Sequence, residues 1–316
     1  MQKSTRPGPA RLGTIVATVA LGASALFAPV AANADSATTA ASVKPTPGTS
    51  SCQVTMRGVS STQRIVSYTY SSENGKATLY TSKDEGGQIG FVPKAFAKKE
   101  SKGSGSPDAL GPTGNDYYAI APDGNLWLIG VNHDGSLVQK KVNSTWGGVR
   151  SITAVPAISG TPGANLFALT TAGGLNRYTI PAGPTAPTGT TVISSSGWQN
   201  IKTLSYSHSV ILPSQDAGDV FIATAKDGRL IEYTFPRKTP AKWTSKVVAA
   251  SSWQNITSMA IGSCLGDAQA WIGTLSNGDA YLYYDKNSAT PLQSDLAGLG
   301  RIATGWTPNT FSGWSM

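Results

Sequence analysis

The sequence is poor in histidine and glutamate. It contains two histidines, and its glutamates are confined to positions 73, 85, 100 and 232. A Ser-His-Asp or Cys-His catalytic centre requires a histidine, but His133 lies in a turn-forming segment and His208 follows a strand-like run, where non-catalytic roles are typical. Glycoside hydrolysis requires two carboxylates about 5–10 Å apart, and no pair is suggested by these glutamates. We therefore predict that the protein is not an enzyme.

Motifs that hold metals or nucleotides are also missing. The sequence has no H-E-x-x-H, no C-x-x-C, no EF-hand loop, no P-loop and no G-x-G-x-x-G. The pairs Asp123-Gly124, Asp134-Gly135 and Asp227-Gly228 are better explained as turn formers. We expect no metal and no cofactor.

Long apolar runs are confined to the N-terminal end. Residues 1–34 combine a basic start (Lys3, Arg6 and Arg11), an apolar stretch over Thr14–Ala28 and the small-x-small site Ala32-Asn33-Ala34, which is the pattern of a secretory signal peptide. No later segment is apolar enough to cross a bilayer, so we expect a secreted, extracellular protein with no transmembrane segment. Residues 35–51 are rich in Ser, Thr, Ala and Pro and predict a flexible leader.

Charge is sparse and scattered. The formal net charge of +8 includes three bases within residues 1–34, which leaves +5 for the remaining chain. No stripe of bases interleaved with aromatic residues is present, as nucleic-acid binding would require. We expect no nucleic-acid partner, although weak attraction to an anionic cell surface is compatible with this charge.

Cysteine is limited to Cys52 and Cys264. In an oxidising compartment such a pair predicts one disulfide, with free buried thiols as the alternative. It would join the first ordered residues to the last full repeat and would stabilise the fold by roughly 4 kcal/mol or somewhat more in the chain-entropy model.

The remaining sequence, residues 52–316, reads as one all-β domain. No window shows a sustained helical apolar stripe, and 35 Gly and 19 Pro divide the chain into short runs rich in Thr, Val, Ile, Tyr and Trp. A hairpin pattern, in which an aromatic residue precedes a turn glycine by seven or eight positions, recurs about every 48 residues. The five copies are Tyr80–Gly87, Trp127–Gly135, Phe167–Gly174, Phe221–Gly228 and Trp271–Gly278.

A second motif, W-x-x-[IV]-x-x-[LIM], follows several of these hairpins. Clear copies begin at Trp146, Trp198 and Trp253, and degenerate copies lie at Thr62–Tyr68 and Leu299–Ile302. The copy expected near Pro107–Gly114 is unrecognisable, because Lys98–Gly114 reads as a polar loop.

Strand-only repeats of this length predict a β-propeller, because one four-stranded blade fits each repeat. We predict five blades, with six as the alternative. Repeat fragments at both ends indicate that the ring closes by pairing N- and C-terminal strands within one blade.

The turns of these repeats carry side chains suited to sugars, which bind by stacking on aromatic rings and by fixed hydrogen bonds. Trp198-Gln199-Asn200 and Trp253-Gln254-Asn255 are the best such groups. The competing interpretation is that the regularly spaced tryptophans only pack between blades.

The combination of W-x-x-[IV] with an aromatic–Asp-Gly hairpin over roughly Tyr80–Ile302 resembles tachylectin-type β-propellers. These are five-bladed lectins that bind N-acetylated hexosamines between neighbouring blades. The resemblance implies a multivalent, non-catalytic lectin whose partners are glycans or a cell-surface component. The implied ligand-binding residues are Trp198, Gln199, Asn200, Trp253, Gln254, Asn255, Asp227 and Asn277.

Two alternative functions stay open. One is a protein-interaction propeller that uses loops such as Lys94–Gly114. The other is a secreted glycoside hydrolase that depends on Glu232 or Asp84. The sequence leaves the glycan, the number of working sites and the oligomeric state open.

Overall fold

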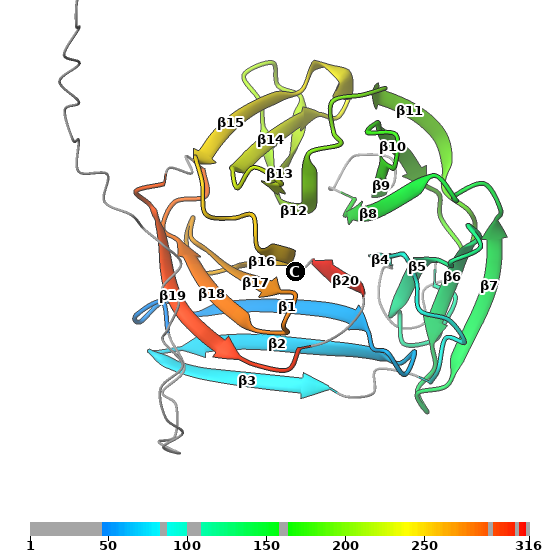
Figure 1. Ribbon diagram of the computed structural model, residues 1–316, viewed down its shortest axis with the longest axis horizontal. Helices are drawn as coiled ribbons and strands as arrows, with labels where there is room; N and C mark the ends of the chain where they lie inside the picture. Colours follow the sequence, from blue (N-terminus) through cyan, green and yellow to red (C-terminus); the bar gives the residue numbers. More distant parts are fainter. Residues whose placement is uncertain are drawn as a thin grey trace, which may run out of the picture.

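The computed structural model describes residues 46–82, 87–99, 109–157, 164–289, 293–306 and 310–313. Within these ranges the chain forms twenty strands in five four-stranded antiparallel sheets, and its one helical element is the short 3-10 turn η1 (Pro240–Lys242). The sheets stand around a common axis as blades (Figure 1). The predicted all-β, five-bladed propeller is confirmed.

The four strands of each blade follow one another from the innermost strand outward. Blade 1 contains β20 (Thr310–Gly313), β1 (Cys52–Val59), β2 (Ile65–Glu73) and β3 (Lys76–Ser82). Blade 2 contains β4 (Ala95–Lys99), β5 (Asp116–Ile120), β6 (Leu126–Val131) and β7 (Leu137–Asn143). Blade 3 contains β8 (Val149–Val155), β9 (Ala164–Thr170), β10 (Leu175–Ile180) and β11 (Thr188–Ser194). Blade 4 contains β12 (Ile201–Ile211), β13 (Ala217–Ala225), β14 (Leu230–Pro236) and β15 (Thr244–Ala249). Blade 5 contains β16 (Ile256–Ser263), β17 (Gln269–Leu275), β18 (Ala280–Asp285) and β19 (Leu296–Ala303).

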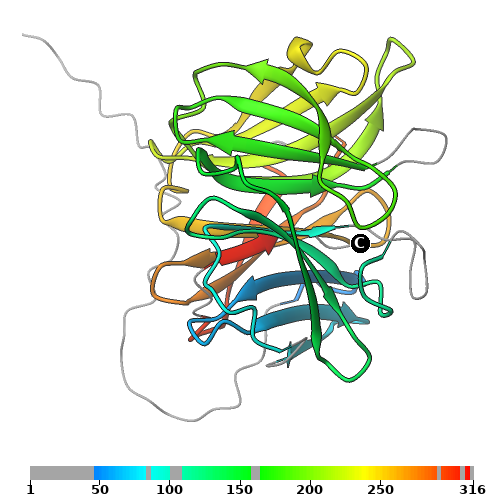
Figure 2. The ribbon, with the colours of Figure 1, turned by 90° about the vertical axis from the view of Figure 1, so that its right-hand side faces the viewer.

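Burial follows position within a blade. Every residue of the second strand β5 is buried, whereas the middle of the outer strand β7 is exposed. The apolar core is divided into five clusters, and each cluster contains residues of two neighbouring blades. Since a twisted sheet has two apolar faces, neither face is covered until the next blade stacks against it, and Figure 2 shows this stacking from the side. The inter-blade contacts are therefore the core of the protein.

The ring closes within blade 1, as predicted. The C-terminal strand β20 pairs antiparallel with β1, from Met56 opposite Gly313 to Val59 opposite Thr310. Closure in one blade by both chain ends requires the whole chain to be folded before the last strand has a partner.

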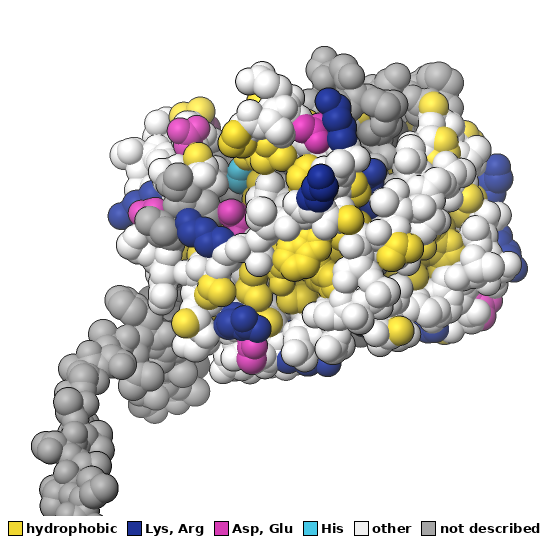
Figure 3. All heavy atoms as spheres, turned by 90° about the horizontal axis from the view of Figure 1, so that it is seen from above, with side chains coloured by type: hydrophobic (Ala, Val, Ile, Leu, Met, Phe, Trp, Pro, Cys, Tyr) yellow, Lys and Arg dark blue, Asp and Glu magenta, His cyan; other side chains and the backbone are white. Residues whose placement is uncertain are grey.

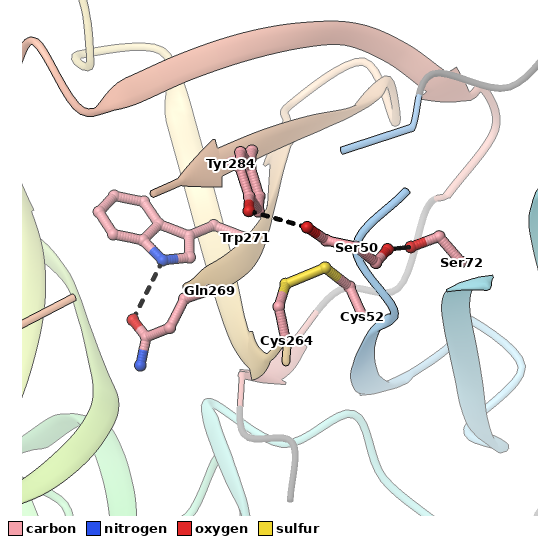
Figure 4. Close-up of a disulfide and its surroundings, with 7 residues drawn as sticks. All are labelled: Ser50, Cys52, Ser72, Cys264, Gln269, Trp271 and Tyr284. Atoms are coloured by element: carbon pink, nitrogen blue, oxygen red, sulfur yellow. Dashed lines mark hydrogen bonds between the residues drawn. A yellow bond between two sulfur atoms is a disulfide. The ribbon is translucent and has the colours of Figure 1, made fainter. Parts of the chain in front are cut away.

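The predicted disulfide is also confirmed, and it lies at the same seam. Cys52 in β1 of blade 1 is bonded to Cys264, which directly follows β16 of blade 5. Around it, the Leu265 N–H donates to the Ser51 carbonyl at 2.9 Å and the Ser50 hydroxyl lies 3.2 Å from the Tyr284 hydroxyl (Figure 4). The disulfide thus joins the first blade to the last.

The predicted alignment of the hairpins is wrong for two copies and shifted in a third. Tyr80 lies on the outer strand β3 and Trp127 on the third strand β6, so neither precedes the turn between the second and third strands. The positive-φ residue of that turn is Gln63 in blade 1 and Gly124 in blade 2. In blade 3 it is Gly173, one position before the predicted Gly174. The cause is that a blade contains several glycine-bearing turns that look alike in sequence.

The two degenerate tryptophan units are also misplaced. Thr62–Tyr68 forms the turn and third strand of blade 1, and Leu299–Ile302 lies within the outer strand β19. The predicted loop Lys98–Gly114 begins too early, because Lys98 and Lys99 belong to β4 and Lys99 is buried.

Some predictions fall outside the described residues. These are the signal peptide at 1–34, the first part of the leader at 35–45, Asp84 and most of the Lys98–Gly114 loop. None of the helical structure in the described ranges is long and apolar enough to span a membrane.

The seam position gives the disulfide a testable weight. We expect the double variant Cys52→Ser, Cys264→Ser to lose about 3–5 kcal/mol of unfolding free energy, because the bond closes a loop with a sequence separation of 212 residues. Urea unfolding followed by tryptophan fluorescence measures this loss, and reductant should destabilise the wild type but leave the double variant unchanged. Equal unfolding midpoints for oxidised and reduced wild type would contradict the prediction.

Candidate functional site

The turn between the second and third strands has the same conformation in every blade. Its positive-φ residues have φ values between 65° and 91°, and they are Gln63, Gly124, Gly173, Gly228 and Gly278. Glycine suits this left-handed conformation because it has no Cβ. In three blades the preceding Asp or Asn accepts the backbone N–H two residues on, as Asp227 Oδ1 does from Arg229 at 3.1 Å. We call each of these segments a hairpin turn.

One backbone hydrogen bond joins each hairpin turn to the segment that leads into the next blade. The N–H of that segment donates to the carbonyl of the positive-φ residue at 2.9–3.0 Å. The five bonds are Ile89 to Gln63, Trp146 to Gly124, Trp198 to Gly173, Trp253 to Gly228 and Trp306 to Gly278. We call each bonded pair a junction. Trp306 and Ile89 occupy the two positions that the sequence motif did not identify.

The junction tryptophans pack against tyrosines of the following blade. Ring centroids lie 4.1–4.6 Å apart in the pairs Trp146–Tyr178, Trp198–Tyr233, Trp253–Tyr283 and Trp306–Tyr68. Trp198 is 3% exposed and Trp253 is 7% exposed, so both indoles belong to the inter-blade core. A ligand at these turns would meet other side chains.

The amides that follow these tryptophans are exposed. Gln199, Asn200, Gln254 and Asn255 all lie at the surface. The Gln254 side-chain oxygen lies against the hairpin turn of blade 4, since a Cβ on Gly228 would stand 2.5 Å from it. Gln199 lies in the same way against Gly173 of blade 3, and its Oε1 accepts the Gly197 N–H at 3.0 Å. Glycine is therefore required at these two turns both for φ and for space.

Three of the predicted residues come together around one hairpin turn. The Asn200 carbonyl accepts the Lys226 N–H at 2.8 Å, so Asn200 borders the turn that carries the exposed Asp227. Gln254 borders the other side of the same turn. Asn277 lies on the next hairpin turn, in blade 5, where its amide hydrogen-bonds with Asp279. We refer to Asn200, Asp227 and Gln254 as the rim site.

Cations four positions after a junction tryptophan fasten neighbouring junctions together. Arg150 Nη2 donates to the Trp198 carbonyl at 2.8 Å, and Lys202 Nζ donates to the Gln254 carbonyl. Partial burial lowers the pKa of both side chains. At the rim site itself Asp227 forms an exposed 2.8 Å ion pair with Arg229, whose hydrogen bonds lower the pKa of Asp227. The rim site is thus polar, with charges already paired.

The described part of the chain contains no group of three or more His, Cys, Asp or Glu side chains placed to hold a metal. Glu232, which the hydrolase alternative requires, is a half-buried residue of β14 opposite Lys246 of β15. Burial raises its pKa to about 7, with Asp285 also raising it and Lys246 opposing the shift. The second residue of that alternative, Asp84, lies outside the described residues.

Sequence reasoning missed a regular tyrosine. A residue five positions after the positive-φ residue packs on the junction tryptophan, and it is Tyr in four blades: Tyr68, Tyr178, Tyr233 and Tyr283. The spacing G-x-x-x-x-Y is visible at Gly173, Gly228 and Gly278 and would have placed the hairpins in register. Trp243, outside every repeat, was also passed over.

No protein-family model and no curated protein sequence matches the chain. Among solved structures, AofleA from Arthrobotrys oligospora aligns over 79% of this chain and 69% of its own, with 11% identity and a TM-score of 0.48. A form of AofleA with three arginines changed to alanine aligns over 78% and 69%, with the same identity and TM-score. BBS1N in complex with ARL6DN aligns over 72% of this chain and 64% of its own, with 13% identity and a TM-score of 0.37. Similarity at this level assigns no family to the chain.

The position of Glu232 predicts a pH-dependent stability. Its folded-state pKa of about 7 lies above the ordinary value of 4.5, so the folded protein holds this proton more tightly than the unfolded chain. The stabilising contribution is complete below pH 4.5 and is lost as the pH rises through 7. In Glu232→Gln the loss is absent, and the melting temperature of the variant minus that of the wild type should increase between pH 4.5 and 8.

Differential scanning fluorimetry across this pH range tests the prediction. Glu73→Gln, at the exposed end of β2, removes the same charge without the burial and serves as the control. A Glu232→Gln difference that stays flat with pH would show that burial does not perturb this carboxyl.

Proposed function

We propose that the protein is a secreted, non-catalytic, multivalent carbohydrate-binding propeller that takes N-acetylated hexosamine glycans at the rim site and its neighbour at Gln199. The observation that supports this most directly is the repeated exposure of a Gln-Asn pair against the hairpin turn of the preceding blade. Secretion rests on the signal-peptide pattern of residues 1–34.

The chemistry of the ligand follows from the side chains. An acetamido group offers one N–H donor and one carbonyl acceptor, and a Gln or Asn amide offers the complementary acceptor and donor. Asn200, Asp227 and Gln254 present both kinds of group from three chain segments around one turn. Because the junction indoles are buried, recognition in this proposal depends on hydrogen bonds more than on stacking.

Multivalency would supply strength that one polar site lacks. The Gln199 and Gln254 positions lie on successive junctions, so one branched or clustered glycan could engage both, and linked sites gain affinity through effective concentration. The Trp146 junction carries Gly147 and Gly148 in place of the amides. The proposal therefore assigns amide sites to two junctions.

A glycan array followed by calorimetric titration with an array-positive N-acetylhexosamine glycan tests the proposal. We expect Asn200→Ala combined with Gln254→Ala to weaken binding about tenfold or more, because each change leaves a ligand group without a hydrogen bond. The melting temperature should change little, since both side chains are exposed. Lys141→Ala on the exposed outer strand β7 is the control and should bind normally.

Two outcomes would contradict the proposal. A blank array from folded protein would exclude the glycan ligand and make a protein partner the leading hypothesis. Undiminished binding by the double variant would remove the rim site from the account.

A further inference from the structure

Trp243 belongs to no repeat. It follows η1 in the connection between β14 and β15 of blade 4 and keeps part of its surface in solvent. Its ring stands nearly edge-on to Trp198 and Tyr233, with centroids 5.6 Å from each and interplanar angles of 67° and 66°. Trp243 therefore adds a third ring on the outer side of the junction between blades 3 and 4.

The other junctions with a tryptophan–tyrosine pair are covered differently. Beside Trp253, the extra ring is Trp271, which is fully buried. Beside Trp306, the half-buried residues include Leu79 and Leu299. A partly exposed indole over the pair is thus a local addition in blade 4, and the repeat pattern does not account for it.

The surface around Trp243 is apolar and open on its outer side. In strand register Ser245 lies opposite Tyr233 and Val247 lies opposite Ile231, so both point to the blade 3 side of β15. Val247 is 49% exposed. Figure 3 looks onto this outer side of the ring and shows apolar side chains gathered in one patch, with Lys and Arg side chains at its border. We call Tyr233, Trp243 and Val247 the outer aromatic patch.

Cations concentrate beside the outer aromatic patch. The connection that contains Trp243 carries Arg237, Lys238 and Lys242 within six residues, and Arg177 of blade 3 donates from Nη1 to the Arg237 carbonyl at 2.6 Å. The two acids of this region are already engaged, since Asp219 accepts Arg237 at 2.6 Å and Asp216 accepts the Lys238 N–H at 3.1 Å. Lys242, adjacent to Trp243, is exposed. The patch therefore has an excess of positive charge at its edge.

We propose that the outer aromatic patch is a second saccharide site, selective for a uronic acid unit whose pyranose ring stacks on Trp243 and whose carboxylate faces Lys242 and Arg177. The apolar C–H face of a pyranose matches an indole, and a carboxylate matches the unbalanced cations. The inference rests on the proposed carbohydrate-binding function, but it concerns a different surface and a different sugar from the rim site.

The test titrates a linear tetramer of galacturonic acid into the purified protein, by calorimetry and by tryptophan fluorescence. We expect Trp243→Ala to weaken binding about tenfold or more through loss of the stacking contact. Lys242→Gln, an exposed change that does not threaten the fold, should weaken binding severalfold and reduce its salt dependence. Asn200→Ala, at the rim site, should bind the tetramer as the wild type does.

Three results would overturn the proposal. The first is absence of tetramer binding by folded wild type. The second is unchanged binding by folded Trp243→Ala and by Lys242→Gln. The third is equally tight binding of the neutral tetramer cellotetraose, which would remove the acidic selectivity.

The outcomes also separate this site from the rim site. Binding of N-acetylhexosamine glycans without binding of the uronic acid tetramer would overturn the outer site alone. Loss of both kinds of binding in the folded wild type would remove the carbohydrate function as a whole.

Discussion

The architecture depends on one backbone hydrogen bond made five times, from the chain that enters a blade to the hairpin turn of the blade before it. The bond requires a turn residue with positive φ, which explains the glycines at 124, 173, 228 and 278 and makes Gln63 the exception. It also fixes where the donor's side chain goes. At four junctions an indole is directed onto a tyrosine of the next blade. Each of the five apolar clusters between blades contains one of these donors.

This constraint shapes the account of function. Because the junctions use the indoles of Trp198 and Trp253 for packing, a ligand at the same turns meets the amides that follow them. The rim site is therefore a polar surface made by chain segments of two blades and held in place by backbone bonds. The outer aromatic patch differs, since Trp243 is free of the junction geometry and retains exposed surface for stacking. The two sites suit different sugars for this reason.

Much of the fold could be predicted from the sequence, because it follows from local signals. Short β-rich runs, glycine turns and a regular spacing gave the five blades, the closure by both chain ends and the disulfide between Cys52 and Cys264. The phase of the repeat was harder to obtain. Gly124 and Gly135 both follow Asp in blade 2 and both have positive φ, so local chemistry does not separate the two turns, and Trp127 was assigned to the wrong one. Ile89 could not be recognised because the junction needs only its N–H group and an apolar side chain. For the candidate site, the residue types were visible, but burial of the indoles and convergence of Asn200, Asp227 and Gln254 depend on the packing of separate blades.

The central claim is that five equivalent junctions hold the ring, and amide hydrogen exchange measured by NMR tests it most directly. The account predicts that the backbone N–H groups of Ile89, Trp146, Trp198, Trp253 and Trp306 exchange together and slowly, at rates close to those of the buried strands, because opening any of them separates two blades. The amides of the exposed neighbours Gln199 and Gln254 should exchange much faster. Fast exchange at the five positions in a folded protein would contradict the account, since the blades would then be held by side-chain packing alone.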